Sequence, residues 1–307
     1  MSDRLAAAFG TYDSYIRALE LAVNDQIKAD IDLISDGQVR GNMLEIYANE
    51  IPGMKSDDGK PVIVGKIQPA PHSIGSNDLS LALKIARKLN PRFKNNTPLL
   101  SHHEFQANFK GIKGIITGPT TLVLSSRIEG FYDKTEKDRA IIDLAWALKK
   151  EVEHLQNSGA AVIQIDEPFL STGIADLKTA RKAVEIISQD VKKPVSMHVC
   201  GTIKEVLAEL LRFKVDIIDC EFAGEKHNLG ALENIDLNKK KIGLGCIDTK
   251  TDEVESKQSV VTIIKKAIDT IGDENLIADP DCGLRLRSRD AAYSKLKVMV
   301  EAVKWLS

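Results

Sequence analysis

Short apolar runs alternate with amphipathic stretches along almost the whole chain. Several of the apolar runs are continuous, which is typical of strands that are buried on both faces. Seven runs have the length of a strand: residues 32–36 (DLISD), 114–118 (GIITG), 161–166 (AVIQID), 195–200 (VSMHVC), 216–221 (DIIDCE), 242–248 (IGLGCID) and 276–282 (LIADPDC). The pattern therefore predicts seven buried, parallel strands.

Helical periodicity fills the gaps between these runs. Apolar residues recur at spacings of three and four in residues 141–155, 206–211, 260–271 and 292–306, which predicts four amphipathic helices. Gly159 stands where the first of them would stop. Thr202 and Glu205 have the spacing of a capping box at the start of the second.

Strand–helix alternation of this kind favours a parallel sheet, and seven similar strands favour an α/β fold of the TIM-type (β/α)8 barrel class. Residues 1–307 are expected to form a single barrel domain. The segment from about 47 to 112 is too long for a plain crossover and is interpreted as an insertion after the second strand. It holds a polar loop (56–60), an apolar run (62–64), a helical stretch (79–89), and an expected exposed loop at His102 and His103.

The composition is that of an ordinary soluble protein, with 43% hydrophobic and 28% charged residues among 307. A formal net charge of −2 gives no argument for binding nucleic acid or an anionic membrane. No signal peptide is visible and no apolar run approaches the ~18 residues of a membrane span, so a cytoplasmic location is expected. In that setting the four cysteines indicate metal-binding or catalytic thiols rather than disulfides.

Nearly every predicted strand ends in a polar residue. The carboxyl ends of all strands meet at one face of a barrel, and that face carries the chemistry. One strand-end aspartate alone would be a helix cap, but the agreement of seven ends favours a functional site. The series is Asp36, Gln38, Thr117, Asp166, Glu167, His198, Cys200, Glu221, Asp248, Asp281 and Cys282.

The strongest combination in this series is His198, Cys200, Glu221 and Cys282. His198 and Cys200 are two residues apart in one strand and point to the same face, while the other two residues end other strands. Imidazole, two thiolates and a carboxylate suit tetrahedral Zn²⁺, so the sequence predicts one zinc ion per chain. The alternative is a core histidine with two buried cysteines.

The other two cysteines fit a metal site less well. Cys220 adjoins Glu221 and is expected to face the helices as a packing residue. Cys246 stands two residues before Asp248, which would turn it inward, but it is not assigned as a ligand.

The predicted ligand set also indicates a type of chemistry. Two thiolates and one carboxylate carry three negative charges against two on the metal, which makes the ion a poor activator of water. An electron-rich zinc can instead keep a substrate thiol deprotonated while the sulfur remains nucleophilic. This predicts alkyl transfer onto sulfur.

Four segments resemble the catalytic barrel of the cobalamin-independent methionine synthase family, in particular its short, single-barrel archaeal-type "core" members. They are 163–168 (IQIDEP), 197–201 (MHVCG), 216–221 (DIIDCE) and 279–284 (DPDCGL). The resemblance extends from about residue 12 to the C-terminus. It implies methyl transfer to homocysteine at a zinc ion.

The resemblance also implies roles for individual residues. His198, Cys200, Glu221 and Cys282 match the zinc ligands, and Asp166 matches a carboxylate that binds the amino group of homocysteine. Asp166 and Glu221 are thus the predicted catalytic residues. Gln38 matches a substrate-binding position that is Glu in the folate-dependent members, where glutamine keeps an acceptor but supplies no charge.

This chain departs from the family pattern at its start. The family's first strand, with a Gly-Ser pair that holds the substrate carboxylate, is not recognisable, and Gly10-Thr11 is a weak echo of that pair. Ile74-Gly75-Ser76 mimics the pair by chance, because it lies in the insertion.

Three further departures concern the methyl donor. The additional N-terminal barrel of the longer, folate-dependent members is not found in this chain. Ser125 replaces a Trp that packs against the pterin, and Lys250 replaces a His thought to protonate the leaving nitrogen. The predicted donor is therefore methylcobalamin or a methylated corrinoid protein as partner, rather than a methylfolate.

Two other functions fit parts of the pattern. A corrinoid-dependent methyltransferase acting on another thiol, such as coenzyme M, also uses a His-x-Cys zinc site, but a sulfonate acceptor would need cations where this chain has Asp166. A non-enzymatic, zinc-stabilised subunit would have a closed four-ligand site and no adjoining pocket.

Overall fold

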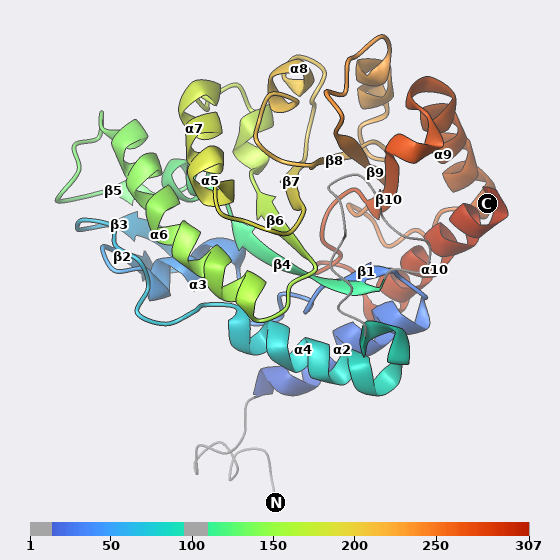
Figure 1. The fold of residues 1–307 in the computed structure, drawn as a ribbon, viewed down its shortest axis with the longest axis horizontal. Helices are drawn as coiled ribbons and strands as arrows, with labels where there is room; N and C mark the ends of the chain where they lie inside the picture. The colour runs from blue at the N-terminus through green and yellow to red at the C-terminus, as the bar shows by residue number, and fades with distance from the viewer. Residues whose placement is uncertain (1–13, 95–109, 307) are drawn as a thin grey trace, which may run out of the picture.

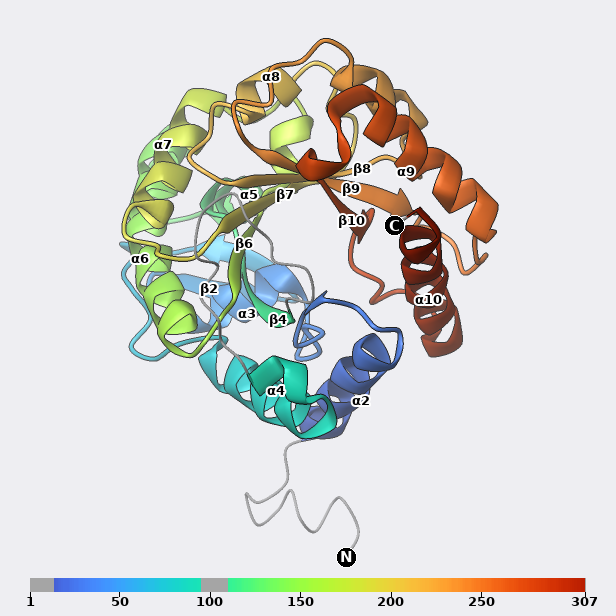
Figure 2. The same cartoon turned by 45° about the vertical axis from the view of Figure 1, so that its right-hand side comes forward.

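Seven of the strands in the described part of the chain form one curled sheet inside a ring of helices (Figures 1 and 2). The structure is a computed structural model and describes residues 14–94 and 110–306. The order of the strands is β1-β4-β6-β7-β8-β9-β10, and every neighbouring pair is parallel. Their bounds are β1 Leu33–Ile34, β4 Gly111–Thr117, β6 Val162–Asp166, β7 Val195–Val199, β8 Ile217–Glu221, β9 Lys241–Ile247 and β10 Leu276–Pro280.

All seven predicted strands are therefore confirmed, and the fold is of the TIM-barrel type. The sequence pattern misplaced some of the ends. β4 begins three residues before the predicted position, and β1 is reduced to two residues. The predicted His102-His103 loop and Gly10-Thr11 lie outside the described residues.

The outer helices are α2 Ser14–Lys28, α4 Ser76–Leu89, α6 Lys137–Asn157, α7 Leu177–Ser188, α8 Leu207–Leu210, α9 Lys257–Ile271 and α10 Arg289–Leu306. The periodic stripes at 141–155, 260–271 and 292–306 are all helical, and α6 ends just before Gly159, whose φ is +102°.

The capping box predicted at Thr202 and Glu205 is wrong. Instead, Asn228 Oδ1 accepts the Ile203 N–H at 3.0 Å, and only the single turn α8 follows, with no side-chain cap.

The segment between β1 and β4, most of which was interpreted as an insertion, contains α3 (Met43–Glu50), a hairpin of β2 (Met54–Asp57) and β3 (Lys60–Ile63), α4 and the short helix η1 (Pro91–Lys94). Helix α4 packs between α2 and α6 as one of the outer helices of the barrel (Figure 2). Strand β3 also pairs in parallel with β5 (Arg127–Ile128), which follows α5 (Pro119–Leu124). The β2–β3 hairpin is thereby joined to the segment that follows β4.

Side chains connect β10, the last strand of the curled sheet, to elements near the other end of the sheet. Strand order begins at β1 and ends at β10, and inside the barrel Lys113 Nζ on β4 donates to Asp279 Oδ2 on β10 at 2.8 Å. Outside the sheet, α10 packs beside α2 (Figure 2), where Arg289 pairs with Asp25 at 2.6 Å and Lys304 pairs with Asp30 at 2.7 Å. Ion pairs between distant parts of the sequence therefore contribute to closing the barrel.

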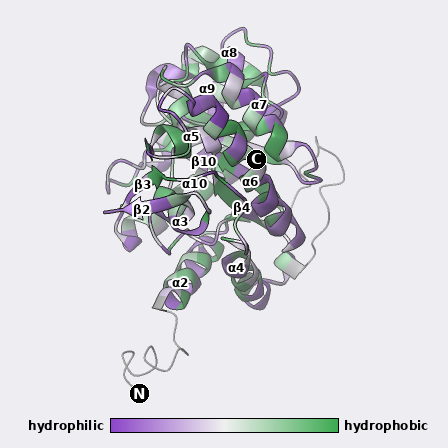
Figure 3. Cartoon of the chain, turned by 90° about the vertical axis from the view of Figure 1, so that its left-hand side faces the viewer, coloured by the Kyte–Doolittle hydropathy of each residue, from purple (hydrophilic) through white to green (hydrophobic). Residues whose placement is uncertain are grey.

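The apolar core lies between the sheet and the helices, not inside the barrel. Outward residues such as Ile163 and Ile165 on β6 pack with Leu144 and Leu148 on α6, and all four are fully buried. In Figure 3, strand β4 is green, whereas the helices carry both green and purple stretches, as amphipathic helices do. The inner face of the barrel carries polar side chains such as Gln164, Asp166, His198 and Asp219 beside apolar ones such as Val162 and Ile217. No helix within the described ranges is long and apolar enough to cross a membrane.

Candidate metal centre

Three polar residues form one layer across neighbouring strands at the centre of the barrel. Asp166 on β6 is the register partner of His198 on β7, which is in turn the partner of Asp219 on β8. Because side chains alternate along a strand, this register sends all three to the same inner face. All three are at most 9% exposed. The layer lies where strands β6, β7 and β8 run side by side (Figure 2).

Ligand atoms of His198, Cys200 and Cys282 lie within 4.8 Å of one another. His198 is buried, Cys200 is half-buried and Cys282 is exposed, so the group opens toward solvent on one side. The structure thus brings together three of the four ligands that the sequence predicts, from β7 and from the end of β10. That they bind a metal stays a prediction, but their grouping is a finding.

The hydrogen bonds of His198 leave one ring nitrogen available. Its Nδ1 lies 3.1 Å from Oδ2 of Asp219, whereas its buried Nε2 has no hydrogen-bond partner among the described residues. Metal-binding histidines usually bond a carboxylate through their second nitrogen in this manner. Gly243 makes room for the carboxylate, because a Cβ atom at this position would lie 2.8 Å from Asp219 Cβ. An orphaned buried nitrogen beside two thiols fits a soft or borderline cation such as Zn²⁺.

The surroundings shift the pKa values of all three side chains in this group. Burial opposes ionisation of His198, but the Asp219 carboxylate outweighs it and raises the pKa of the imidazole well above its usual range. The neighbouring Cys200 thiol and His198 ring lower the pKa of Cys282 to about 4, while the same contact with Cys282, together with burial, raises the pKa of Cys200. One thiolate is therefore already favoured in this group.

Glu221 lies outside the group of three and contacts a lysine. It ends β8, is 4% exposed, and its Oε1 accepts a hydrogen bond from Lys250 Nζ at 2.7 Å. The same ammonium lies 3.4 Å from Glu225 Oε1. The predicted role of Glu221 as a fourth ligand stays a prediction, and its observed partner is Lys250.

Asp281 ties the strand end that carries Cys282 to the loop after β8. Its carboxylate accepts the backbone N–H groups of Phe222, Ala223 and Gly224 at 2.9, 3.0 and 2.6 Å. Gly245 on β9 permits this approach, because a Cβ atom there would lie 2.4 Å from Asp281 Oδ1. Asp281 thereby fixes the spacing between the ends of β8 and β10.

Asn228 makes a similar connection between β7 and β8. It is fully buried, and its Nδ2 donates to the carbonyl oxygens of Gly201 at 2.9 Å and Glu221 at 2.8 Å. Ser171 Oγ donates to the Cys200 carbonyl at 2.6 Å. The backbone around each strand end is thus held by a specific side chain.

Asp166 lies beside the His198, Cys200 and Cys282 group, as the sequence predicted. Gln164 Nε2 donates to its Oδ1 at 2.8 Å, and burial raises the pKa of the carboxyl despite the nearby His198. Gln38 lies in the loop after β1, half-buried, with a φ of +44° and its N–H bonded to Asp36 Oδ1 at 2.9 Å. Substrate-binding roles for both residues stay predictions.

The remaining cysteines lie in the apolar core. Cys220 is fully buried, as predicted for a packing residue. Cys246 is fully buried in the same core. Its neighbour on β9, Gly245, faces the inside of the barrel, where a Cβ atom would meet Asp281. The strand alternation therefore turns Cys246 toward the helices, and the inward orientation suggested by its spacing from Asp248 is wrong.

Sequence reasoning missed several inward polar residues. Asp219 and Gln164 each stand two positions before a predicted site residue in the same strand, and that spacing could have identified them. Lys113 was missed because the predicted strand began one residue after it. Its pairing with Asp279 joins segments 166 positions apart, which no local pattern reveals.

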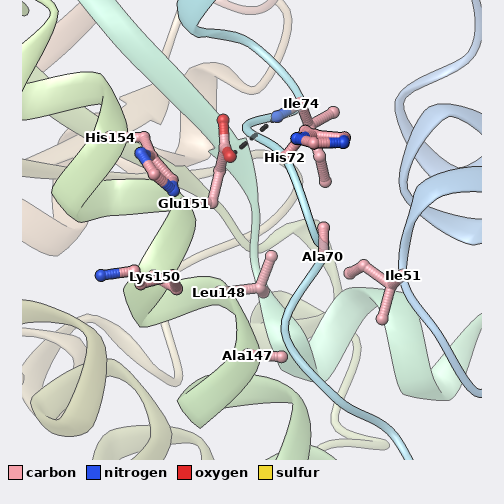
Figure 4. A pocket seen from close by; sticks show the side chains of 9 residues that line it. All are labelled: Ile51, Ala70, His72, Ile74, Ala147, Leu148, Lys150, Glu151 and His154. Carbon is pink, nitrogen blue, oxygen red and sulfur yellow. Dashed lines mark hydrogen bonds between the residues drawn. The ribbon is translucent and has the colours of Figure 1, made fainter.

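A small pocket elsewhere contains none of the predicted site residues (Figure 4). It lies between α6 and the segment before α4, where Glu151 accepts the backbone N–H groups of Ile74 and Gly75, both at 2.8 Å, and Ser73 Oγ at 3.0 Å. The Ile74-Gly75-Ser76 triplet is thus the start of α4 held by Glu151. This agrees with its interpretation as a chance likeness.

The comparisons with known proteins agree with this geometry. Residues 3–305 match the family model described as "Cobalamin-independent synthase, Catalytic domain". A methionine synthase of Methanothermobacter thermautotrophicus is 49% identical over 302 residues, covering 98% of this chain and 93% of that protein. A methionine synthase of Methanocaldococcus jannaschii is 42% identical, with coverages of 98% and 92%.

Solved structures show the same fold at low identity. A B12-independent methionine synthase from Shewanella sp. W3-18-1, in complex with selenomethionine, superposes with a TM-score of 0.76 at 20% identity, over 95% of this chain and 87% of that one. A putative vitamin-B12-independent methionine synthase from Listeria monocytogenes gives 0.70 at 19% identity, with coverages of 99% and 92%.

Proposed function

The chain belongs to the catalytic-domain family of the cobalamin-independent synthases, and from this premise we propose that it makes methionine by transferring a methyl group to homocysteine at a zinc centre. The grouping of His198, Cys200 and Cys282 within 4.8 Å at the open end of the barrel carries the proposal.

His198, Cys200 and Cys282 would hold the ion, with Glu221 as a fourth, displaceable ligand. When bound, zinc supplies a Lewis acid that keeps a substrate thiol deprotonated near neutral pH. Asp219 orients the ring of His198 and keeps its Nε2 aimed at the site. The exposure of Cys282 leaves the thiol of a substrate a route to the group.

Asp166 supports an amino-acid substrate. Its buried carboxylate lies one strand from His198 and can bind the ammonium of homocysteine, for which Gln38 would offer a further acceptor. An acidic residue at this position opposes a sulfonate acceptor such as coenzyme M, because two anions would then face each other in a buried site.

The residues of the proposed site fit a corrinoid methyl donor better than a methylfolate. Removing a methyl group from a folate amine leaves a nitrogen that needs a proton, whereas methyl-cobalt leaves Co(I), which needs none. By resemblance, Lys250 stands where the folate-dependent members have a histidine, and its hydrogen bond to Glu221 raises its pKa, which would make it a poor acid. Methylcobalamin or a methylated corrinoid protein is therefore the proposed donor.

A donor panel tests the proposal. Zinc-loaded protein is given homocysteine with methylcobalamin, methyltetrahydrofolate or a methyl-pterin of the methanopterin type, and methionine is quantified. Faster methionine formation from methylcobalamin is expected. A faster rate from either pterin would refute the corrinoid donor, and methylation of 2-mercaptoethanesulfonate in preference to homocysteine would refute the proposed acceptor.

A further inference from the structure

Glu221 is held by the ammonium group of Lys250, which lies in the loop after β9. Glu221 is only 4% exposed, and Lys250 Nζ donates to its Oε1 at 2.7 Å. A buried carboxylate with a direct ammonium partner is strongly fixed, because leaving it would expose an uncompensated charge. Glu221 is thus engaged by the protein itself, not by the His198, Cys200 and Cys282 group.

The loop that carries Lys250 is built rigidly. Lys295 on α10 is fully buried and donates to the Asp248 carbonyl at 2.9 Å and to both carboxylate oxygens of Glu255, at 3.0 and 3.1 Å. Glu255 in turn accepts the N–H of Asp248 at 2.9 Å, and Asp248 Oδ1 accepts the N–H of Lys250 at 2.8 Å. The backbone of Lys250 is therefore held through Asp248, which Lys295 and Glu255 fix in turn.

The space for the ammonium is also shaped by the chain. A Cβ atom on Gly224 would lie 3.2 Å from Lys250 Nζ and 3.1 Å from Asp281 Oδ2, so the absence of a side chain at this position leaves the lysine its path to Glu221. The lysine side chain is 54% exposed, whereas that of Glu221 is 5% exposed. The ion pair thus joins a buried carboxylate at the end of β8 to a lysine side chain that is open to solvent.

We propose that Lys250 is a positioning residue that competes with the metal for Glu221 and keeps the fourth ligand position exchangeable for a thiol. The inference rests on the proposed zinc site. Without the ammonium, Glu221 would turn to the metal and bind it more tightly, and an incoming thiol would have to displace a stronger ligand. Lys250 therefore lowers the affinity for the metal and raises the affinity for the substrate thiol.

A double-mutant cycle on zinc affinity tests this proposal independently of turnover. Zinc dissociation constants are measured by competition with a chelator for the wild type, Lys250→Met, Glu221→Gln and the double variant. Lys250→Met should tighten zinc binding about 3- to 10-fold in the presence of Glu221 and leave it unchanged in the Glu221→Gln background. Lys250→Arg should behave as the wild type, and Lys257→Met serves as a control for removing one positive charge from the adjacent helix α9.

Homocysteine binding to the zinc-loaded proteins gives the second measurement. Lys250→Met should weaken it several-fold, while Lys257→Met should not. Unchanged zinc affinity in Lys250→Met would overturn the proposal, as would equal tightening in both backgrounds, which would indicate a general charge effect. A wild-type protein that binds no zinc would overturn the proposed function as well, so the two failures are distinguishable.

Discussion

Nδ1 of His198 and Oδ2 of Asp219 lie 3.1 Å apart on adjacent strands, and this contact determines which ring nitrogen is left for a ligand. Asp219→Asn removes the negative charge while keeping an acceptor of similar shape. We expect zinc affinity to fall about 10- to 100-fold, the usual effect of losing such a partner. Chelator competition measures the change.

A control separates this effect from general damage to the strand. The circular dichroism and thermal unfolding of zinc-free Asp219→Asn should stay close to those of the zinc-free wild type. An unchanged zinc affinity in a folded variant would show that Asp219 does not act through His198.

The cysteines divide into two classes that metal analysis can distinguish. Cys200→Ser and Cys282→Ser should each lose stoichiometric zinc, because both thiols belong to the group around His198. Cys246→Ala is the matched control. This variant should keep its zinc, because Cys246 is buried in the apolar core. Full zinc occupancy in both serine variants would refute the predicted centre.

Asp166 should matter for the amino acid and not for the thiol alone. Asp166→Asn removes the charge that would pair with an ammonium, and a charge-assisted hydrogen bond contributes about 1.5–3 kcal/mol. Homocysteine binding should therefore weaken about 10- to 100-fold, whereas binding of a simple alkyl thiol should change much less. Calorimetry on zinc-loaded protein measures both affinities.

The neighbouring residue offers a matched control for this experiment. Glu167 is also fully buried, but its carboxylate accepts the N–H groups of Thr120 and Thr121 at 3.0 and 2.8 Å at the start of α5. Glu167→Gln should leave the ratio of the two affinities unchanged. An equal loss of both ligands in Asp166→Asn would remove Asp166 from substrate recognition.

Glu151 predicts a pH dependence of stability far from the metal group. Burial raises the pKa of this carboxyl above its ordinary value of 4.5, so the folded state keeps the proton to higher pH than the unfolded state does. The contribution of Glu151 to stability is thus complete below about pH 4.5 and is lost as pH rises through the folded pKa.

Denaturant unfolding of the wild type and Glu151→Gln between pH 4 and 8 measures this effect. The free energy of unfolding of the wild type, relative to that of the variant, should decrease as pH rises. A constant difference across the range would mean that Glu151 titrates alike in the folded and unfolded states.

The sequence revealed most of the sheet because buried parallel strands leave a strong local signal. In runs such as 161–166 and 195–200, the positions that face the helices are all apolar, and polar residues occur only at positions that face into the barrel. All seven runs form strands. The grouping of His198, Cys200 and Cys282 also followed from strand ends alone, since the barrel brings those ends to one face.

What the sequence did not reveal depends on contacts between distant segments. Lys113 and Asp279 meet across the barrel, and Asn228 replaces the cap that Thr202 was expected to supply. The partner of Glu221 was equally hidden, because Lys250 reaches it only through a loop held by a buried lysine on the last helix. Such tertiary contacts override local patterns.

X-ray absorption at the zinc edge, with and without homocysteine, tests the central claim most directly. The account predicts two sulfur ligands in the zinc-loaded protein, from Cys200 and Cys282, and three after homocysteine is added, with one oxygen or nitrogen ligand lost. A sulfur count that stays at two when homocysteine is bound would contradict activation of the substrate thiol at this centre.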